Sequence, residues 1–272
     1  IAEKIIKKGF LIANIKINFD QMGKIKNNYE ITGFVKDVKI SLFDKYQLSK
    51  INFNFGLNKD EFNFKNINLY LNKNKIFLPL LKNEKINQKF LVSGKINSIN
   101  FNLQESDLKN IPELNQFQQN IQKIEFSSEN TFEFEIDKKF KIKKLKTLSK
   151  IDLNELILEN ETDLIKFFPN IKDEIKFKKN KIELEYNNEI LKLKGSGKIL
   201  IQNVDDKIEY NLTKNKKNLM FKTNLNISNN PLIFDFLNFQ KEKDSTLTIK
   251  VKGNKKIKNN IFFEKIHLEE KK

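Results

Sequence analysis

The chain has 272 residues and carries 51 basic against 35 acidic side chains, a formal net charge of +16. Every basic residue is Lys, whereas proteins that read base sequence depend on Arg, so the composition argues against a specific nucleic-acid partner. Lys, Asn, Ile and Phe also have AT-rich codons, so drift in genomic base composition is an alternative explanation for much of this charge. The absence of Cys excludes disulfides and thiolate metal sites. No apolar run reaches the ~20 residues of a membrane-spanning helix.

Apolar residues alternate with polar ones along most of the chain, which is typical of half-buried β-strands. The first long strands are expected over 31–42, 46–57, 62–71 and roughly 88–103. Later segments repeat the pattern, and the sequence therefore predicts a mainly β protein. These later strands are expected over 132–136, 140–145, 151–158, 182–186, 191–193, 199–201, 208–212, 219–227, 247–251 and 261–268.

Many of these strands contain a two-residue step, in which alternation stops for two polar residues and then resumes. A tight hairpin would produce this pattern, but two-residue hairpin turns favour Gly, and none of the skipped pairs contains it. A β-bulge also keeps the apolar side facing one way while bending the strand, and we favour it over the hairpin. The skipped pairs are Lys36-Asp37, Ser49-Lys50, Lys65-Asn66, Asn97-Ser98, Lys143-Lys144, Asn154-Glu155 and Glu264-Lys265.

Three segments depart from alternation and predict short helices that would cover sheet ends. Residues 106–121 place apolar side chains at helical spacing. A second helix is expected from Leu164 to Phe168, ended by Pro169, and a third after the cap and first-turn proline of Asn230-Pro231. No linker rich in Gly or Pro divides the chain, although the basic stretch 138–150 is a possible soft boundary.

The bulged strands predict a long, bent antiparallel sheet that forms an open gutter, with residues 1–272 as one elongated segment. The 25 Phe residues fit the lining of such a groove or, equally, the closed core of a sandwich whose two sheets cover each other. In the groove interpretation, the lining candidates are Val35, Val38, Phe53, Phe55, Phe64, Leu69, Ile96, Ile99, Phe101 and Phe134.

Catalytic and metal-binding motifs are lacking. His267 is the only His and sits in a strand pattern, which favours an exposed position over a metal ligand. The GSGK sequence at 195–198 lacks the spacing of a phosphate loop, and Gly195 and Gly197 are expected to allow a backbone bend in a sheet. Glu133 and Glu135 fit a solvated strand face, and Asp205-Asp206 fits a turn. We expect no enzyme activity, no catalytic residues, no metal and no cofactor.

The glycine-containing strand starts "VSGKINSINFNL" (92–103), "ITGFVKDVKISL" (31–42) and "LKGSGKILIQN" (193–203) resemble the AsmA-like family of TamB- and YhdP-type envelope lipid-transport proteins. The likeness is a strand pattern that spans most of the chain. It implies a periplasmic protein, anchored in the inner membrane through a segment not present in this fragment, with phospholipid acyl chains as its partners.

The resemblance implies a segment that conducts phospholipids along an apolar β-groove between the inner and outer membranes, which it would reach through missing parts of the chain. Two alternatives come from other classes of protein. One is a structural or adhesive β-protein with a closed core and no ligand. The other is a nonspecific polyanion-binding β-domain that uses its Lys-rich faces.

Overall fold

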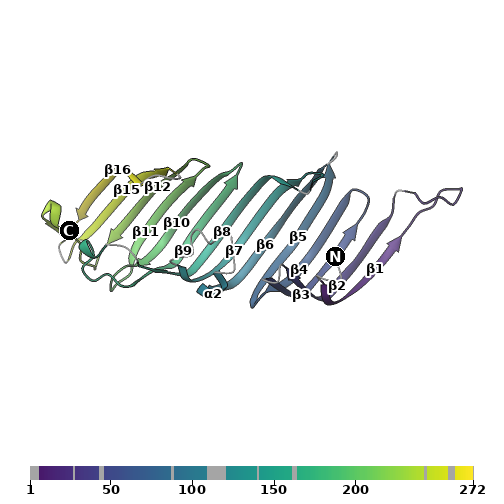
Figure 1. Cartoon of the computed structure of the whole chain (residues 1–272), viewed down its shortest axis with the longest axis horizontal. Coiled ribbons are helices and arrows are strands. Elements are labelled where there is room, and N and C mark those ends of the chain that lie inside the picture. Colours follow the sequence, from purple (N-terminus) through teal and green to yellow (C-terminus); the bar gives the residue numbers. More distant parts are fainter. Residues whose placement is uncertain are drawn as a thin grey trace. The chain divides into compact units, whose positions relative to one another are not determined.

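A computed structural model describes residues 6–26, 28–42, 46–86, 89–108, 121–139, 141–160, 164–241, 244–256 and 261–271. It is mainly β, as predicted. One open antiparallel sheet of 14 strands has the order β1 to β12, then β15 and β16 (Figure 1), and β13 pairs with β14 alone. The strands are β1 (Ile6–Lys16), β2 (Glu30–Leu42), β3 (Tyr46–Leu57), β4 (Glu61–Leu71), β5 (Asn74–Ile86), β6 (Lys89–Gln104), β7 (Ile121–Ile136), β8 (Ile142–Glu159), β9 (Glu174–Asn187), β10 (Ile190–Leu200), β11 (Asp206–Lys214), β12 (Asn218–Ile227), β13 (Ile233–Phe234), β14 (Phe239–Gln240), β15 (Thr246–Lys256) and β16 (Ile261–Lys271).

The chain divides into two compact units. Unit 1 comprises Ile1–Asn100 and Ser128–Leu148, and unit 2 comprises Phe101–Ser127 and Ser149–Lys272. Strands β6, β7 and β8 contribute residues to both units. One change of unit, between Leu148 and Ser149, falls in the basic stretch 138–150.

The alternation located β2, β3, β4 and β6 to within a residue or two, but the sequence did not predict β1 or β5. Pro79 lies in the middle of β5 and normally argues against a central strand, because it cannot donate to the ladder. The pairing of β5 with β6 shifts register between Phe77 and Leu81, so the proline sits inside an irregularity. A bulge thus accommodates Pro79 within the sheet.

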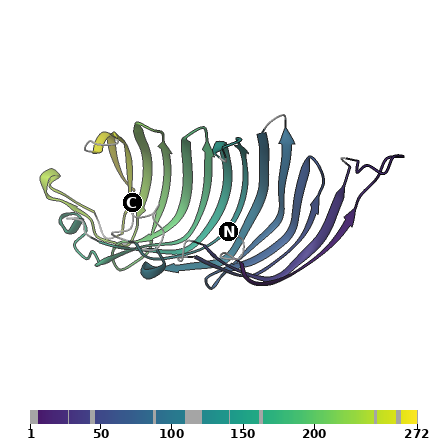
Figure 2. The same cartoon turned by 45° about the vertical axis from the view of Figure 1, so that its right-hand side comes forward.

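The two-residue steps of the first strands are bulges, as predicted, and not hairpins. Strands β2, β3 and β4 run unbroken through them, and the pairings of β2 with β3 and of β3 with β4 shift register there. In each step the second residue is left-handed: Asp37, Lys50 and Asn66 have φ of 54°, 49° and 54°. The extra residue returns the next apolar side chain to the same face, and Figure 2 shows the strands curving along their length.

Asparagine side chains satisfy the backbone groups that these bulges leave unpaired. Asn52 donates to the Lys50 carbonyl at 2.8 Å and accepts from the Asp37 N–H at 3.0 Å. Asn68 likewise donates to the carbonyl of Asn66 at 3.1 Å. Because unpaired backbone groups in a sheet are costly, the Asn two residues after the left-handed position stabilises the bend.

The step predicted at Asn97-Ser98 is wrong in position. Strand β6 is continuous, but its left-handed residue is Asn100, with φ of 49°. Ser98 therefore stays on the apolar face, where its hydroxyl is 2.8 Å from that of Ser128 and both residues are buried. Ile99 faces the other way and is 70% exposed. Alternation alone did not reveal this step, because a buried pair of hydroxyl groups replaces an apolar contact.

Glycines on the apolar face make room for aromatic rings of the neighbouring strand. A Cβ at Gly33 would lie 2.7 Å from the Phe55 ring, and one at Gly195 would lie 2.4 Å from the Tyr210 ring. Gly195 is paired directly with Tyr210 in an unshifted stretch of β10 and β11, but the pairing of β10 with β9 shifts register between Ser196 and Lys198, around Gly197. Gly33 and Gly195 thus make room for a ring, whereas a Cβ at Gly197 would lie 2.5 Å from the side chain of Asn180.

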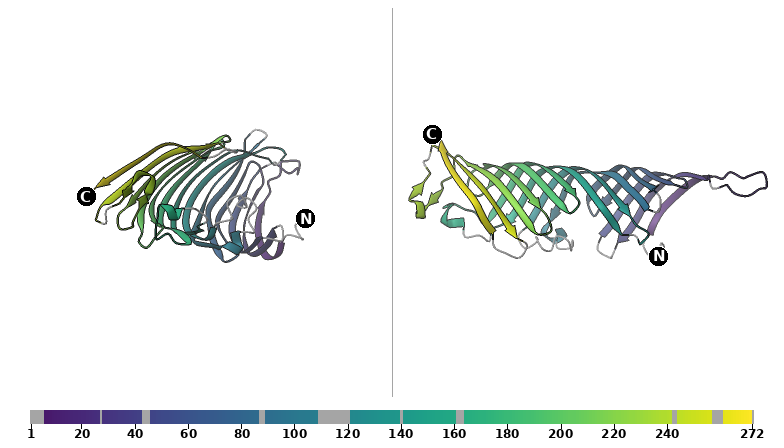
Figure 3. Two further views of the ribbon diagram at one scale, coloured as in Figure 1. Left: turned by 60° about the vertical axis from the view of Figure 1, so that its left-hand side comes forward. Right: turned by 90° about the horizontal axis from the view of Figure 1, so that it is seen from above.

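Unit 2 contains a buried hydrophobic cluster closed by segments outside the large sheet. Ile227, Leu232 and Leu247 are 0% exposed, and Phe168 packs in the same cluster. Leu232 precedes the short β13–β14 hairpin, which lies beside the sheet (Figure 3, olive). These segments close the apolar face of unit 2 at this end.

The covering segments are not the helices that the sequence predicted. The first contains only a 3-10 turn, η3 (Leu164–Lys166), and no helix starts at Pro231, because η4 (Asp235–Leu237) begins four residues later. Asn230 does not cap a helix. Its side chain donates to the Val204 carbonyl and to Asp206, both at 2.7 Å. Of the helix predicted over 106–121, only α2 (Glu105–Leu108) and residue 121, which begins β7, lie among the described residues.

Candidate apolar face

The candidate site is a row of apolar positions that crosses unit 1 from β2 to β7. The ladder pairs Gly33 with Phe55, Phe55 with Phe64, Phe64 with Leu81, and Leu81 with Gly94. A Cβ at Gly94 would lie 2.8 Å from the Phe132 ring, which continues the row onto β7. Directly paired residues point to the same face of a sheet, so these side chains form one apolar band. The row consists of Gly33, Phe55, Phe64, Leu81, Gly94 and Phe132.

Aromatic contacts hold the row together, yet it is not fully buried. The Phe53 ring lies 6.3 Å from that of Phe55 and 5.7 Å from that of Phe64, both edge to face. Phe132 stacks on Phe134 at 5.9 Å. Every side chain of the row is half-buried, whereas the buried apolar residues of unit 1 flank it at other positions on the strands. The band thus keeps apolar surface accessible.

The structure brings some of the predicted lining residues together. Val35 pairs with Phe53 and is buried, and the Phe53 ring lies beside the rings of Phe55 and Phe64. Val38 pairs with the buried Ile51 across the bulges.

The other lining candidates lie on separate strands, and the prediction is wrong for Ile99, which faces away from the apolar row and is 70% exposed. Leu69 pairs with Ile76, and Ile96 is half-buried on β6. Phe101 is buried in unit 2, with its ring 5.4 Å from that of Phe126. Phe134 stacks on the last ring of the row.

The opposite face of unit 1 carries ion pairs. Lys146 contacts Glu133 at 3.1 Å, and Glu135 contacts Lys144 at 2.6 Å and Lys89 at 3.0 Å. Hydrogen bonds from Lys144 and Lys89 hold the pKa of Glu135 below its ordinary value. The solvated strand face predicted for Glu133 and Glu135 is confirmed, with alternating charges that pair across strands.

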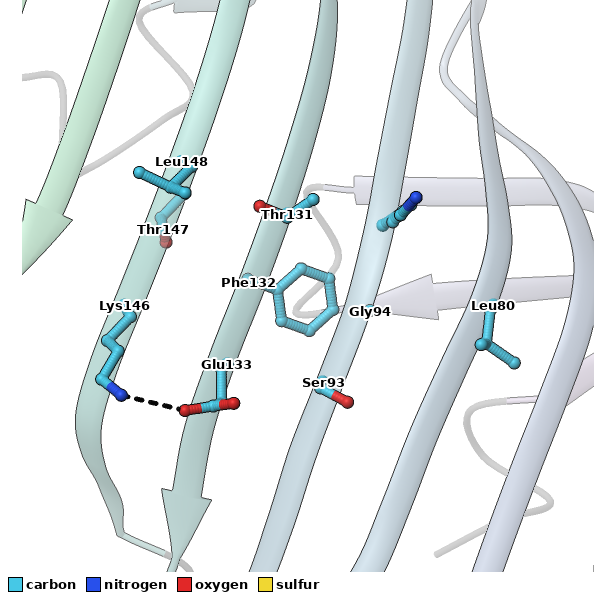
Figure 4. A pocket seen from close by; sticks show the side chains of 10 residues that line it. Leu80, Ser93, Gly94, Thr131, Phe132, Glu133, Lys146, Thr147 and Leu148 are labelled. Carbon is cyan, nitrogen blue, oxygen red and sulfur yellow. Dashed lines mark hydrogen bonds and ion pairs between the residues drawn. The ribbon is translucent and has the colours of Figure 1, made fainter.

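A hollow of about 450 Å³ lies over β5 to β8 in unit 1 (Figure 4). Ser93 and Lys95 flank Gly94 in its lining, and Thr131 and Glu133 flank Phe132. Since successive residues of a strand point to opposite faces, most of this lining belongs to the polar face. The hollow therefore lies mainly on the polar face, and it meets the apolar row only at Gly94 and Phe132.

Asp206 is a buried carboxyl group that sequence reasoning assigned to a turn. It begins β11, is 3% exposed, and accepts hydrogen bonds from the Asn230 side chain at 2.7 Å and the Ser228 N–H at 3.3 Å. Burial raises its pKa, against these hydrogen bonds and the charge of Lys241. Asp205 is different, because it pairs with Lys178 at 3.1 Å. The double Asp resembles a turn in sequence, and no local signal marks the second residue as buried.

The remaining sequence motifs offer no chemical site. His267 is exposed on β16, opposite Lys250. Within the described ranges, no group of three or more His, Cys, Asp or Glu residues is placed to hold a metal ion. In the same part of the chain, no helix has the length and apolarity needed to cross a membrane.

Comparisons with protein-family models, curated proteins and solved structures give no match for this chain. We therefore infer function from the chain's own residues and from the likeness of its strand pattern.

Proposed function

We propose that this chain is a segment of a periplasmic AsmA-like protein that conducts phospholipids between the inner and outer membranes. Acyl chains would lie on the apolar face of the open sheet, bent into a gutter with that face inside. The observation that carries the proposal is the half-buried apolar row of unit 1, from Gly33 through Phe55 and Phe64 to Phe132. An anchor in the inner membrane would be supplied by a segment outside this sequence.

The chemistry of the two faces suits a lipid that moves. Burial of apolar surface contributes roughly 25 cal/mol per Å² and has no preferred direction, so an acyl chain held by Phe55 and Phe64 is free to slide. The opposite face, with ion pairs such as Lys146–Glu133, favours water. Headgroups would remain near the solvated edge of the apolar band.

A structural β-protein with a closed core is the second candidate, and unit 2 favours it. There Ile227 and Leu247 are completely buried together with Leu232 of the covering 228–241 segment, so these side chains offer no surface to a ligand. A similar cover over unit 1 would turn the row into a closed core.

Site-specific photo-crosslinking distinguishes the two candidates. A photoreactive residue at Phe55 should give phospholipid adducts in cells, and mass spectrometry of the purified chain should detect co-purifying phospholipid. The matched control is Ile99, also apolar and in unit 1 but exposed on the opposite face, where no adduct is expected. A folded protein without bound lipid, and without adducts from Phe55, would favour the structural protein.

A further inference from the structure

The connection between β1 and β2 forms a hairpin that extends beyond the neighbouring strands (Figure 1, purple end). Phe19 and Ile25 make an isolated antiparallel bridge in it, outside the named strands. We refer to residues 17–26 as the tip hairpin. It belongs entirely to unit 1.

The turn at the end of the tip hairpin is ordered by its own hydrogen bonds. The Asp20 side chain accepts from the N–H groups of Met22 and Lys24, both at 2.9 Å, and the Asp20 N–H donates to the Lys24 carbonyl at 2.9 Å. Gly23 adopts φ of 74°, which glycine favours. The turn therefore satisfies much of its own backbone and holds Met22 at the apex.

Large apolar side chains gather on this turn in the open. Met22 is 78% exposed, Ile25 64% and Phe19 57%, although a soluble surface rarely keeps such residues in contiguous groups without a partner. Lys24 and Lys26 flank Ile25 in the sequence. The tip hairpin thus carries an exposed apolar apex next to two Lys side chains.

We propose that the tip hairpin docks on the surface of an anionic lipid bilayer. Met22, Phe19 and Ile25 enter the boundary between headgroups and acyl chains, while Lys24 and Lys26 contact the phosphate groups. Apolar insertion together with electrostatic attraction is the combination that binds interfacial segments to membranes. The net charge of +16 adds a long-range attraction to the same surface.

A bilayer fits this surface better than a protein strand does. A strand added to a sheet edge is held by the edge's unpaired backbone groups. In the turn around Asp20, several backbone groups are already hydrogen-bonded within the turn. The apolar apex offers no directional contact, which matches a fluid interface. This proposal does not depend on the apolar row of unit 1, since a structural protein could dock in the same way.

The chain has no Cys, so a single fluorescent label can be placed at the apex. Met22→Cys, labelled with the environment-sensitive dye NBD, should brighten and shift to the blue with phosphatidylcholine vesicles that contain about a quarter phosphatidylglycerol. Pure phosphatidylcholine should give a much smaller response. Phe236→Cys is the matched control, because Phe236 is 73% exposed but lies in η4 of unit 2.

Charge at the apex should weaken docking of the full chain. Met22→Asp is expected to reduce partitioning onto the same anionic vesicles by about tenfold, whereas Phe236→Asp should leave it within about twofold. Equal losses from both variants, or no signal from the label at Met22, would overturn the proposal. A label response that depends on protein concentration without vesicles would also overturn it, because it indicates a protein partner. Crosslinking from Phe55 tests the lipid row separately.

Discussion

Unit 1 and unit 2 are built from the same kind of strand but differ in how far their apolar faces are buried. In unit 2, Ile227, Leu232 and Leu247 are 0% exposed, whereas in unit 1 Phe55 and Phe64 remain half-buried. Both units use bulges, and both place rings over glycines. The difference arises from the connections: alternating strands produce an apolar face, and the segments between them decide whether that face is closed.

The cover of unit 2 is attached by polar side chains. Gln202 is fully buried, donates to the Pro231 carbonyl at 2.8 Å and accepts from the Asn170 N–H at 3.1 Å. Asn230 adds its bonds to Val204 and Asp206. Buried polar groups of this kind must form hydrogen bonds, so they fix the position of the cover over the apolar residues beneath it.

The largest expected effect is a loss of stability on emptying the closed core. Leu232→Ala should lower the free energy of unfolding by about 3 kcal/mol, since truncation of a buried Leu leaves a cavity. Phe64→Ala in unit 1 should cost about half as much, because its side chain is already partly in water. Urea unfolding monitored by circular dichroism measures both values. A larger loss from Phe64→Ala would mean that unit 1 is also a closed core.

The sequence predicted the strands well because alternation records which side of each strand is apolar. It also predicted that the skipped pairs are bulges, since pairs such as Ser49-Lys50 lack the glycine of a tight hairpin. It could not place every bulge. In β6 the buried residue is Ser98, a polar residue whose partner Ser128 lies thirty residues away along the chain.

The same limit applies to the candidate site. Alternation identifies Phe55 and Phe64 as apolar positions, but the row they form depends on strand register, which the bulges shift. The burial of Asp206 depends on Asn230, which is remote in sequence. Long-range pairing and polar contacts are therefore the information that a single strand pattern does not carry.

Glycine substitutions test the close contacts between glycines and aromatic rings that occur in both units. A Cβ at Gly94 would lie 2.8 Å from the Phe132 ring and 2.9 Å from the Leu80 carbonyl oxygen. Gly94→Ala should therefore destabilise the protein by about 1–3 kcal/mol. Gly56→Ala is the matched control, because a Cβ there meets nothing within 4 Å. If both variants unfold at the parent's urea concentration, the rings do not need these glycines.

A smaller effect is expected at the bulges. Asn66 has φ of 54°, a conformation that a β-branched side chain strongly disfavours, so Asn66→Val should cost about 1–2 kcal/mol. Asn66→Gly should be close to neutral, since glycine adopts this conformation readily. In unit 2 the equivalent test is Lys179, with φ of 51°. Equal unfolding temperatures for Asn66→Val and Asn66→Gly would contradict the bulge assignment.

The smallest expected effect is a difference in pH dependence between two carboxyl groups, Asp206 of unit 2 and Asp137 of unit 1. Burial raises the pKa of Asp206 above its ordinary value of 3.8, partly offset by its bonds from Asn230 and Ser228. The N–H of Lys141 and, after it, the side chain of Lys143 lower the pKa of Asp137 to about 2. The two groups therefore act on stability in opposite directions and in different pH ranges.

The signs follow from which state binds the proton more tightly. Folded Asp206 keeps its proton to a higher pH than the unfolded chain does, so its effect is to lower stability as pH rises from the unfolded pKa through the raised folded value. Asp137 contributes stability that is present above 3.8 and is lost as pH falls towards 2. Asp206→Asn should therefore flatten the fall in urea midpoint that begins as pH rises through about 4, and Asp137→Asn should alter only the range below about pH 4. If the Asp206→Asn protein keeps the parent's slope above about pH 4, the carboxyl group under the cover of unit 2 is already in contact with water, and that end of the sheet is as open as unit 1.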